Sequence, residues 1–426
     1  MNGSETHRAI EAVWRIESAK LIAALARIVR DIGLAEDLAH DALVIALERW
    51  PETGIPNNPA AWLMTTAKHR AIDRLRHNKM AERKQQELGS EMEIRHELSE
   101  SDFEAVLDEK EDLDDDLLRL IFTACHPVLS TEARVALSLR VLGGLATPEI
   151  ARAFLVPEPT IAQRIVRAKR TLAEARVPFE VPYGAERTRR LRSVLEVIYL
   201  IFNEGYSATA GDDWMRPALC EEALRLGRIL AELMQGEAEV HGLVALMELQ
   251  SSRMRARTGA SGEPILLLDQ NRARWDQLLI RRGLAALDRA EKLGSESGPY
   301  TLQAAIAACH ARARTPEQTD WARIAALYDA LSQVSPSPVV ELNRAVALSM
   351  AYGPEVGLEL VDSLTAEPAL RNYHLLPSVR GDLLVKLGRF DEARTEFERA
   401  ADLTHNSRER ELLLDRARAA TEDPHP

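Results

Sequence analysis

The sequence has few cysteines. Cys125, Cys220 and Cys309 are the three in a chain of 426 residues, and they lie far apart. Their odd number and wide spacing exclude a disulfide framework, and the lack of a C-x-x-C motif excludes the common zinc-site patterns. A protein with so few cysteines is expected in a reducing compartment.

Aromatic residues are also scarce, at 5% of the chain, while alanine, leucine, arginine and glutamate are abundant. These four residue types have high helix propensity, so the composition predicts an all-α fold. A chain of 426 residues exceeds the size of one ordinary domain. Roughly two to four domains are expected.

A long hydrophobic run is missing too. The first residues, MNGSETHRAIEAVW, lack the apolar centre of a signal peptide. The most apolar early run, residues 21–34, is interrupted by Arg27 and Arg30 and is too short to span a bilayer. These absences predict a cytoplasmic protein that makes no membrane contact.

Residues in a catalytic or metal-binding pattern are absent as well. Cys125 and His126 are neighbours, but neighbouring side chains on a helix point about 100° apart and do not form a nucleophile with its base. The histidines lack the spacing of metal ligands. We therefore expect no enzymatic activity, no metal and no cofactor.

Negative charge is concentrated in one segment. Residues 86–116 hold 14 acids and 2 bases, so their net charge of −12 equals that of the whole chain. Basic segments lie on either side, with 7 bases and 2 acids in 62–84 and 5 bases and 1 acid in 159–176. The pattern predicts two small domains joined by an acidic linker, 86–113. The linker is either a solvated tether or a segment with its own role.

Hydrophobic residues recur at helical spacing on both sides of this linker. In the first domain, predicted over 8–85, a proline-rich loop precedes a basic helix with Asn58 as N-cap and Pro59 at its first position. In the second domain, predicted over 114–178, Ser130 is the expected cap of a central helix.

The end of the second domain has the pattern of a helix-turn-helix. A short helix with Thr147 as N-cap is followed by the turn VPEP and by a second helix from about Pro159 to Ala175. The buried stripe expected on this second helix consists of Ile161, Ile165, Ala168 and Leu172. The outer face then carries Thr160, Gln163, Arg164, Arg167 and Arg170.

Such a helix fits the major groove of DNA, which is about 12 Å wide, and arginine and glutamine suit guanine and adenine edges. The alternative is an ordinary amphipathic helix with a solvated basic face.

Two segments together resemble a known family. GLAEDLAHDALVIALERW followed by NPAAWLMTTAKHRAIDRLR resembles region 2 of bacterial sigma factors of the extracytoplasmic-function type. The segment TEARVALSLRVLGGLATPEIARAFLVPEPTIAQRIVRAKRTLAEAR resembles their region 4. The resemblance covers about 160 residues of the chain.

The resemblance implies a role for each segment. An acidic helix of region 2 would bind the core RNA polymerase through Glu36, Asp37, Leu38 and Asp41. The following loop and helix would melt and read the −10 promoter element through Asn57, Asn58, Trp62, Lys68, Arg70, Arg74 and Arg76. The second helix of region 4 would read the −35 element through Thr160, Gln163, Arg164, Arg167 and Arg170.

The C-terminal part is expected to be helical throughout, with a middle domain of unknown role at 185–290. Within 291–426, HLLPSVRGDLLVKLGRFDEARTEFERAADL resembles a tetratricopeptide repeat. Gly353 and Gly388 are 35 residues apart, close to the usual period of 34. Repeats of this kind stack into a solenoid with a concave face. The loop 203–213 is either a ligand-binding loop or a plain polar connection.

The combination resembles extracytoplasmic-function sigma factors with a fused tetratricopeptide-like extension. It implies core RNA polymerase and promoter DNA as partners, with a protein or small molecule bound by the extension. The alternative is a helix-turn-helix regulator that binds duplex DNA without polymerase and uses the solenoid as a sensor. The acidic helix and the −10-like helix favour the sigma factor, since a simple regulator needs neither.

Overall fold

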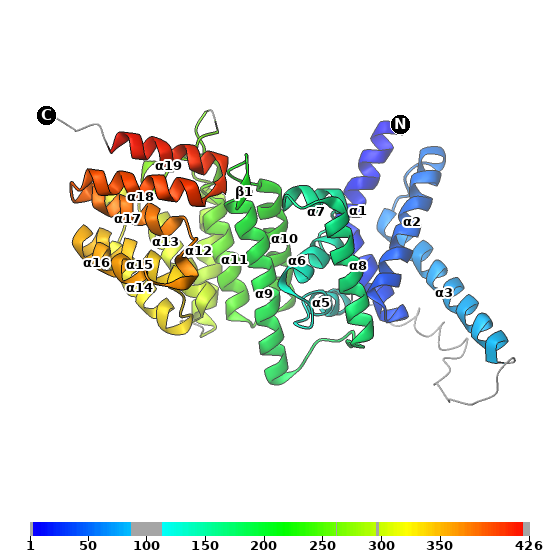
Figure 1. The fold of residues 1–426 in the computed structure, drawn as a ribbon. Coiled ribbons are helices and arrows are strands. Elements are labelled where there is room, and N and C mark those ends of the chain that lie inside the picture. The colour runs from blue at the N-terminus through cyan, green and yellow to red at the C-terminus, as the bar shows by residue number, and fades with distance from the viewer. Residues whose placement is uncertain (1–2, 87–112, 261, 295–297, 421–426) are drawn as a thin grey trace. The chain divides into compact units, whose positions relative to one another are not determined.

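The regular structure of the chain is almost entirely helical, which confirms the all-α prediction (Figure 1). The computed structural model describes residues 3–86, 113–260, 262–294 and 298–420. Most of the acidic linker predicted over 86–113 therefore lies outside the described residues. The chain divides into two compact units, Met1–Val197 and Ile198–Pro426, here called unit 1 and unit 2.

Unit 1 begins with three helices that pack together: α1 (Gly3–Val29), α2 (Ile32–Thr53) and α3 (Pro59–Gln86). Leu21, Leu25 and Trp50 are each at most 2% exposed in their core. The loop before α3 ends as expected, because the Asn58 side chain accepts a hydrogen bond from the Ala61 amide at 3.0 Å.

The second half of unit 1 contains α5 (Leu113–Ala124), α6 (Thr131–Val141), α7 (Thr147–Ala153) and α8 (Glu158–Glu174). The first residues of α9 (Gly184–Tyr206) belong to unit 1 as well. Ser130 caps α6 as predicted, with its hydroxyl 3.3 Å from the Ala133 amide. The predicted cap Thr147 is wrong by one residue: Ala146 is the N-cap of α7, and its amide donates to the Glu149 carboxylate at 2.7 Å.

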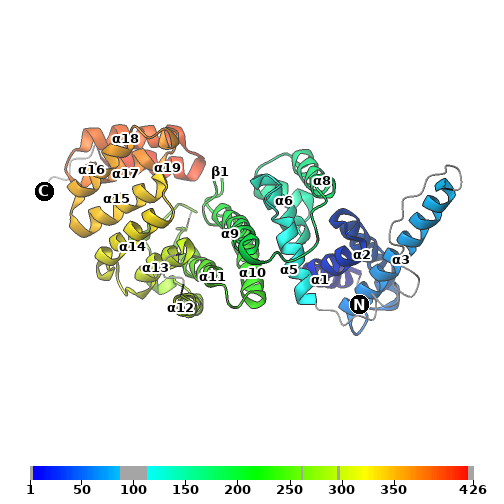
Figure 2. The same cartoon turned by 90° about the horizontal axis from the view of Figure 1, so that it is seen from below.

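Unit 2 contains the rest of α9 and ten further α-helices among its described residues (Figure 2). The first five of these are α10 (Pro217–Leu233), α11 (Ala238–Ser251), α12 (Gln277–Lys292), α13 (Pro299–Arg312) and α14 (Trp321–Val334). The last five are α15 (Pro338–Tyr352), α16 (Pro354–Leu364), α17 (Leu375–Lys386), α18 (Phe390–Leu403) and α19 (Ser407–Ala419).

Short 3-10 helices complete unit 2: η1 (Met254–Ala256), η2 (Leu267–Asp269), η3 (Arg272–Arg274), η4 (Pro316–Gln318) and η5 (Pro368–Leu370). The helices from α14 to α19 pack against their neighbours along the chain, and α17, α18 and α19 lie side by side (Figure 1). Leu383 and Phe397, in α17 and α18, are 2% and 1% exposed in the core they share. No helix in the described parts of the chain is both long and apolar enough to cross a membrane.

Gly353 and Gly388 occupy equivalent turns. Gly353, with φ of 112°, separates α15 from α16, and Gly388, with φ of 70°, lies between α17 and α18. A positive φ strains any residue with a side chain, so glycine suits both turns. The 35-residue spacing thus marks two successive helical hairpins, although their assignment to the tetratricopeptide class stays a prediction.

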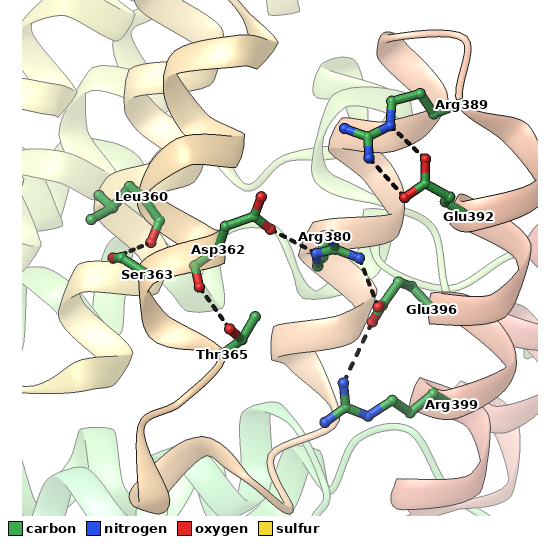
Figure 3. Close-up of polar contacts among 9 residues, drawn as sticks. All are labelled: Leu360, Asp362, Ser363, Thr365, Arg380, Arg389, Glu392, Glu396 and Arg399. Atoms are coloured by element: carbon green, nitrogen blue, oxygen red, sulfur yellow. Dashed lines mark hydrogen bonds and ion pairs between the residues drawn. The ribbon is translucent and has the colours of Figure 1, made fainter.

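An arginine joins three successive helices of this region (Figure 3). Arg380 of α17 donates to Asp362 of α16 and to Glu396 of α18, at 2.8 Å in each case. Its side chain is 19% exposed, so the two ion pairs lie partly out of water. The contacts fix α17 against both neighbours.

The loop 203–213 packs against a distant part of unit 2. Its strand β1 (Ala210–Gly211) pairs in parallel with β2 (His405–Asn406). The side-chain amide of Asn406 donates to the backbone carbonyl oxygens of Ala208 and Asp213 at 3.2 and 2.9 Å. These contacts favour a plain polar connection over a ligand-binding loop.

Gly381→Ala is expected to destabilise unit 2, because a Cβ at this position would lie 2.7 Å from Cε1 of Phe397. Overpacking of this kind costs about 1–3 kcal/mol, and the urea midpoint of unfolding should fall. Gly236→Ala is the control, since nothing lies within 4 Å of its Cβ position. Equal midpoints for the two variants would contradict the close packing of α17 on α18.

Candidate nucleic-acid interface

The helix α8 presents the two faces that its sequence predicts. Its stripe of Ile161, Ile165, Ala168 and Leu172 is between 1% and 6% exposed. On the opposite face Gln163, Arg167 and Arg170 are exposed, while Thr160 and Arg164 are half-buried. The five predicted contact residues therefore share one side of α8, and three of them are open to solvent.

Ion pairs modify this outer face. Arg170 donates to Glu174 one turn further along, at 2.6 Å, and both side chains are largely exposed. The charge of Arg164 lowers the pKa of Glu132 in α6, after the hydrogen bonds of that carboxylate to its own backbone and to Ser130. Of the three exposed side chains on this face, Arg170 is held by an ion pair within the described residues. Arg167 and Gln163 are therefore the more accessible contact residues.

The short connection between α7 and α8 fits a helix-turn-helix. Leu155 adopts a φ of 50°, and Pro157 precedes the first residue of α8. The Val156 amide donates to the Ala151 carbonyl at 3.0 Å, which closes the end of α7. Ile150 is completely buried and anchors α7 in the core of unit 1.

In the region predicted to read the −10 element, the structure separates exposed from inward side chains. Asn57 and Asn58 are exposed in the loop, and Arg70, Arg74 and Arg76 are exposed on α3. Trp62 is half-buried, with its ring centroid 5.3 Å from that of Trp50. Asn58 also has a structural role as the cap of α3.

Lys68 is less exposed than the arginines that follow it on α3. Its pKa is lowered, first by burial and then by the nearby charge of Arg27, against the opposing effect of Asp116. Asp116 of α5 is 1% exposed and accepts from Arg27 at 3.0 Å and from Arg119 at 2.7 Å. Lys68 thus lies beside the contact between α1 and α5.

The four residues predicted to bind polymerase divide into two pairs. Asp37 and Asp41 are exposed and one turn apart on α2, whereas Glu36 and Leu38 are buried. Leu38, at 4% exposed, packs in the core of the first three helices. The exposed part of the predicted polymerase-binding set is therefore Asp37 and Asp41.

Glu36 joins the two halves of unit 1. Its carboxylate lies 2.6 Å from Nε of Arg140 in α6 and 2.5 Å from Nζ of Lys169 in α8, and the residue is 3% exposed. His40 adds a contact, with its Nε2 3.0 Å from the Arg140 guanidinium. One carboxylate of α2 thus contacts both α6 and the helix expected to read DNA.

The Glu36 pKa reflects two opposing effects. Burial acts to raise the pKa, but the charges and hydrogen bonds of Lys169 and Arg140 outweigh it, and the result lies below the ordinary value of 4.5. The carboxylate is therefore ionised at neutral pH.

The partners Arg140 and Lys169 were missed by the sequence analysis. Lys169 follows the buried Ala168 and lies one turn after Ile165, so it is at the edge of the buried stripe. That position marks a cation able to reach another helix, but no pattern in the sequence identifies Glu36, more than 130 positions away, as its partner.

Comparisons with known proteins agree with this arrangement. Residues 16–80 match the model of Sigma-70 region 2, and residues 119–172 match that of Sigma-70 region 4. Residues 190–291 match a family of unknown function, DUF6596. The chain is 46% identical over 387 residues to an uncharacterized protein of Rhizobium meliloti (strain 1021), which covers 91% of this chain and 90% of the relative.

An α-helical pair of domains, the second with an exposed basic helix after a tight turn, and the matches to two Sigma-70 regions together indicate a DNA-binding transcription protein. With both sigma regions matched in order, the chain belongs to the extracytoplasmic-function type of RNA polymerase sigma factors, with a helical C-terminal extension. Core RNA polymerase and promoter DNA are the partners that these two domains define.

Glu36→Gln is expected to loosen the contact of α2 with α6 and α8, because it leaves Arg140 and Lys169 without their carboxylate. Loss of one member of a buried pair costs about 3 kcal/mol. The measurement is the distance between spin labels at Glu48→Cys and Arg170→Cys, which are exposed, whereas the three natural cysteines are buried. The distance distribution should broaden.

Acid should have the same effect as this substitution. A carboxylate whose pKa is lowered by folding stabilises the contact of α2 with α6 and α8 at any pH above the ordinary pKa of 4.5. That contribution is lost as the pH falls through the pKa of the folded protein. Asp37→Asn is the matched control, since it removes the same charge from an exposed neighbour. A Glu36→Gln distribution as narrow as that of the control at pH 7 would contradict the role of Glu36.

Proposed function

We propose that this sigma factor divides promoter recognition among three surfaces of unit 1. Asp37 and Asp41 on α2 bind core polymerase, Asn57 with the exposed arginines of α3 contacts the −10 element, and the outer face of α8 contacts the −35 element. The observation that carries the proposal is the exposure of these groups on helices whose other faces are buried.

The polymerase contact is narrower than the sequence suggests. Of the four residues predicted for it, Asp37 and Asp41 are exposed at a spacing that places them on one helix face. Paired carboxylates of this kind suit a basic groove on a partner, where charge complementarity fixes the register and speeds association.

Under this proposal, promoter binding requires the two halves of unit 1, which Glu36 joins through Arg140 and Lys169, to separate. Elements centred about 25 base pairs apart are separated by about 85 Å of duplex, since each pair rises about 3.4 Å. In the structure α2 and α8 are joined through Glu36 and Lys169 at 2.5 Å. We infer that this ion pair breaks when the two halves engage their separate elements, and that the acidic linker then spans the gap.

The helical C-terminal extension is proposed to regulate the separation of the two halves of unit 1 by binding a ligand of its own. A helix-turn-helix regulator without polymerase remains the second reading. It leaves unexplained why residues 16–80 match Sigma-70 region 2. The decisive observation is specific initiation by core polymerase when the purified chain is added.

Asp37→Lys combined with Asp41→Lys should abolish association with core polymerase, because the two exposed carboxylates proposed to bind it are reversed. Co-purification with core enzyme measures the effect, and the helical content should not change. Glu398→Lys with Asp402→Lys is the control, with the same spacing on the exposed face of α18. Normal co-purification of the α2 variant would remove the support for a polymerase contact there.

Arg167→Ala is expected to weaken binding to the cognate −35 site by about 1–3 kcal/mol and to relax preference at one base position. Arg192→Ala, an exposed arginine of α9, is the matched control. Binding is compared on cognate and scrambled duplexes at fixed salt. If Arg167→Ala binds both duplexes as the unmodified protein does, α8 is not the reading helix.

A further inference from the structure

The arginines of unit 2 follow a pairing rule. Among the described residues, every buried or half-buried arginine of unit 2 outside one cluster forms an ion pair with a carboxylate. The pairs are Arg216 with Glu204, Arg225 with Glu222, Arg228 with Glu248, Arg344 with Glu341, Arg380 with Asp362 and Glu396, Arg408 with Glu411, and Arg416 with Asp382. The exceptions are Arg253, Arg257 and Arg272.

These three arginines lie together among three aromatic rings, those of Tyr206, Trp275 and Trp214, and the Trp214 centroid is 5.5 Å from the guanidinium carbon of Arg257. The guanidinium carbon of Arg257 is 3.6 Å from the ring centroid of Tyr206, and that of Arg253 is 5.8 Å from the same centroid. Arg253 is also 5.8 Å from the ring of Trp275, and Arg272 is 4.9 Å from it. Tyr206 and Trp275 thus connect three cations from two segments into one cluster, since Arg253 and Arg257 flank η1 and Arg272 begins η3.

The protein compensates these charges only in part. Arg257 is 7% exposed and donates to the Tyr206 carbonyl, while Arg272 donates to the carbonyls of His310 and Ala313 at 2.6 and 2.7 Å. Ring faces and carbonyl oxygens carry partial charge, so none of these contacts neutralises a cation.

The electrostatic consequence is visible in the pKa values. Burial lowers the pKa of both Arg257 and Arg272, and repulsion from Arg253 lowers them further. The carboxylate that acts on Arg272, Glu317, is exposed and lies beyond ion-pair distance within the described part of unit 2. The cluster therefore has a surplus of positive charge.

Polar atoms around the cluster lack hydrogen-bond partners. Among the described residues, Nε1 of Trp275, Nε of Arg272 and Nδ1 of His310 are buried without one. Trp275 and His310 are only 4% and 7% exposed. Burial and the charges of Arg253 and Arg272 lower the pKa of His310 to about 3, so its ring is neutral.

The first two of these atoms are obligatory donors, and a buried donor left unpaired costs about 1–3 kcal/mol. Bound water would satisfy the N–H groups but would leave three positive charges uncompensated. An oxyanion would satisfy both.

We propose that the cluster of Arg253, Arg257, Arg272 and Trp275 in unit 2 is a binding site for a small anion that carries phosphate or carboxylate groups. Its carboxylate or phosphate oxygens accept from the guanidinium groups and from the Trp275 N–H. Arg253 and Arg272 are half-buried whereas Arg257 is buried, so the ligand approaches the cluster from the side of these two arginines.

The test is isothermal titration calorimetry of the full chain. The chain is titrated with pyrophosphate and, separately, with citrate, each at low and at high sodium chloride concentration. Saturable binding of one or both anions is expected, and the comparison tells a phosphate from a carboxylate ligand. Arg253→Gln should weaken the binding at least about tenfold, the usual effect of losing a charged hydrogen bond. Arg274→Gln, an exposed arginine of η3, is the control with the same change of charge.

A second variant keeps the test decisive if Arg253→Gln unfolds. Trp275→Phe retains a six-membered aromatic ring and removes the five-membered ring with its N–H, and it should also weaken binding. The proposal is overturned if neither anion binds saturably, or if Arg274→Gln weakens binding as much as the cluster variants do. Because polymerase and DNA are absent, this result is independent of the proposed function.

Discussion

The ion pairs of Glu36 are the interaction on which the arrangement of unit 1 depends. A carboxylate that is 3% exposed survives in the folded protein because Arg140 and Lys169 both reach it. Coulomb attraction between such groups is strong where water is excluded, but the cost of desolvation is also large, so the contact holds only while all three groups stay in place. A contact of this kind suits a domain pair that we propose to separate on promoter DNA.

Unit 2 handles its cations differently. Arg380 spans three helices through two carboxylates, and the charge is balanced within the fold (Figure 3). Around Tyr206 and Trp275 the same residue type is left without that balance. The contrast matters because a helical extension needs apolar stripes for stacking and paired charges for its surface, but it needs no surplus of buried positive charge. Such a surplus is a property of a site rather than of a scaffold.

Much of the local structure could be predicted from sequence. The stripe of Ile161, Ile165, Ala168 and Leu172 is buried as its spacing indicates, and Asn58 and Ser130 cap the helices they precede. These features depend on contacts within a few residues, which periodicity and capping chemistry describe well. The cap of α7 was wrong by one residue: the N-cap is Ala146, and its amide donates to the carboxylate of Glu149 three residues later, as in half of a capping box. The pairing of β1 with β2, some 195 positions apart, had no local signal at all.

The sequence by itself thus determined the helical class, the basic outer face of α8 and the acidic face of α2, since each is set by residues three or four positions apart. The tertiary structure alone decided which of those side chains are available. It buried Glu36 and Leu38 while leaving Asp37 and Asp41 in water, and it brought Lys68 beside Asp116. It also gathered Arg253, Arg257 and Arg272 around shared rings. The physical reason is that burial and charge pairing depend on neighbours in space, which come from helices distant in the chain.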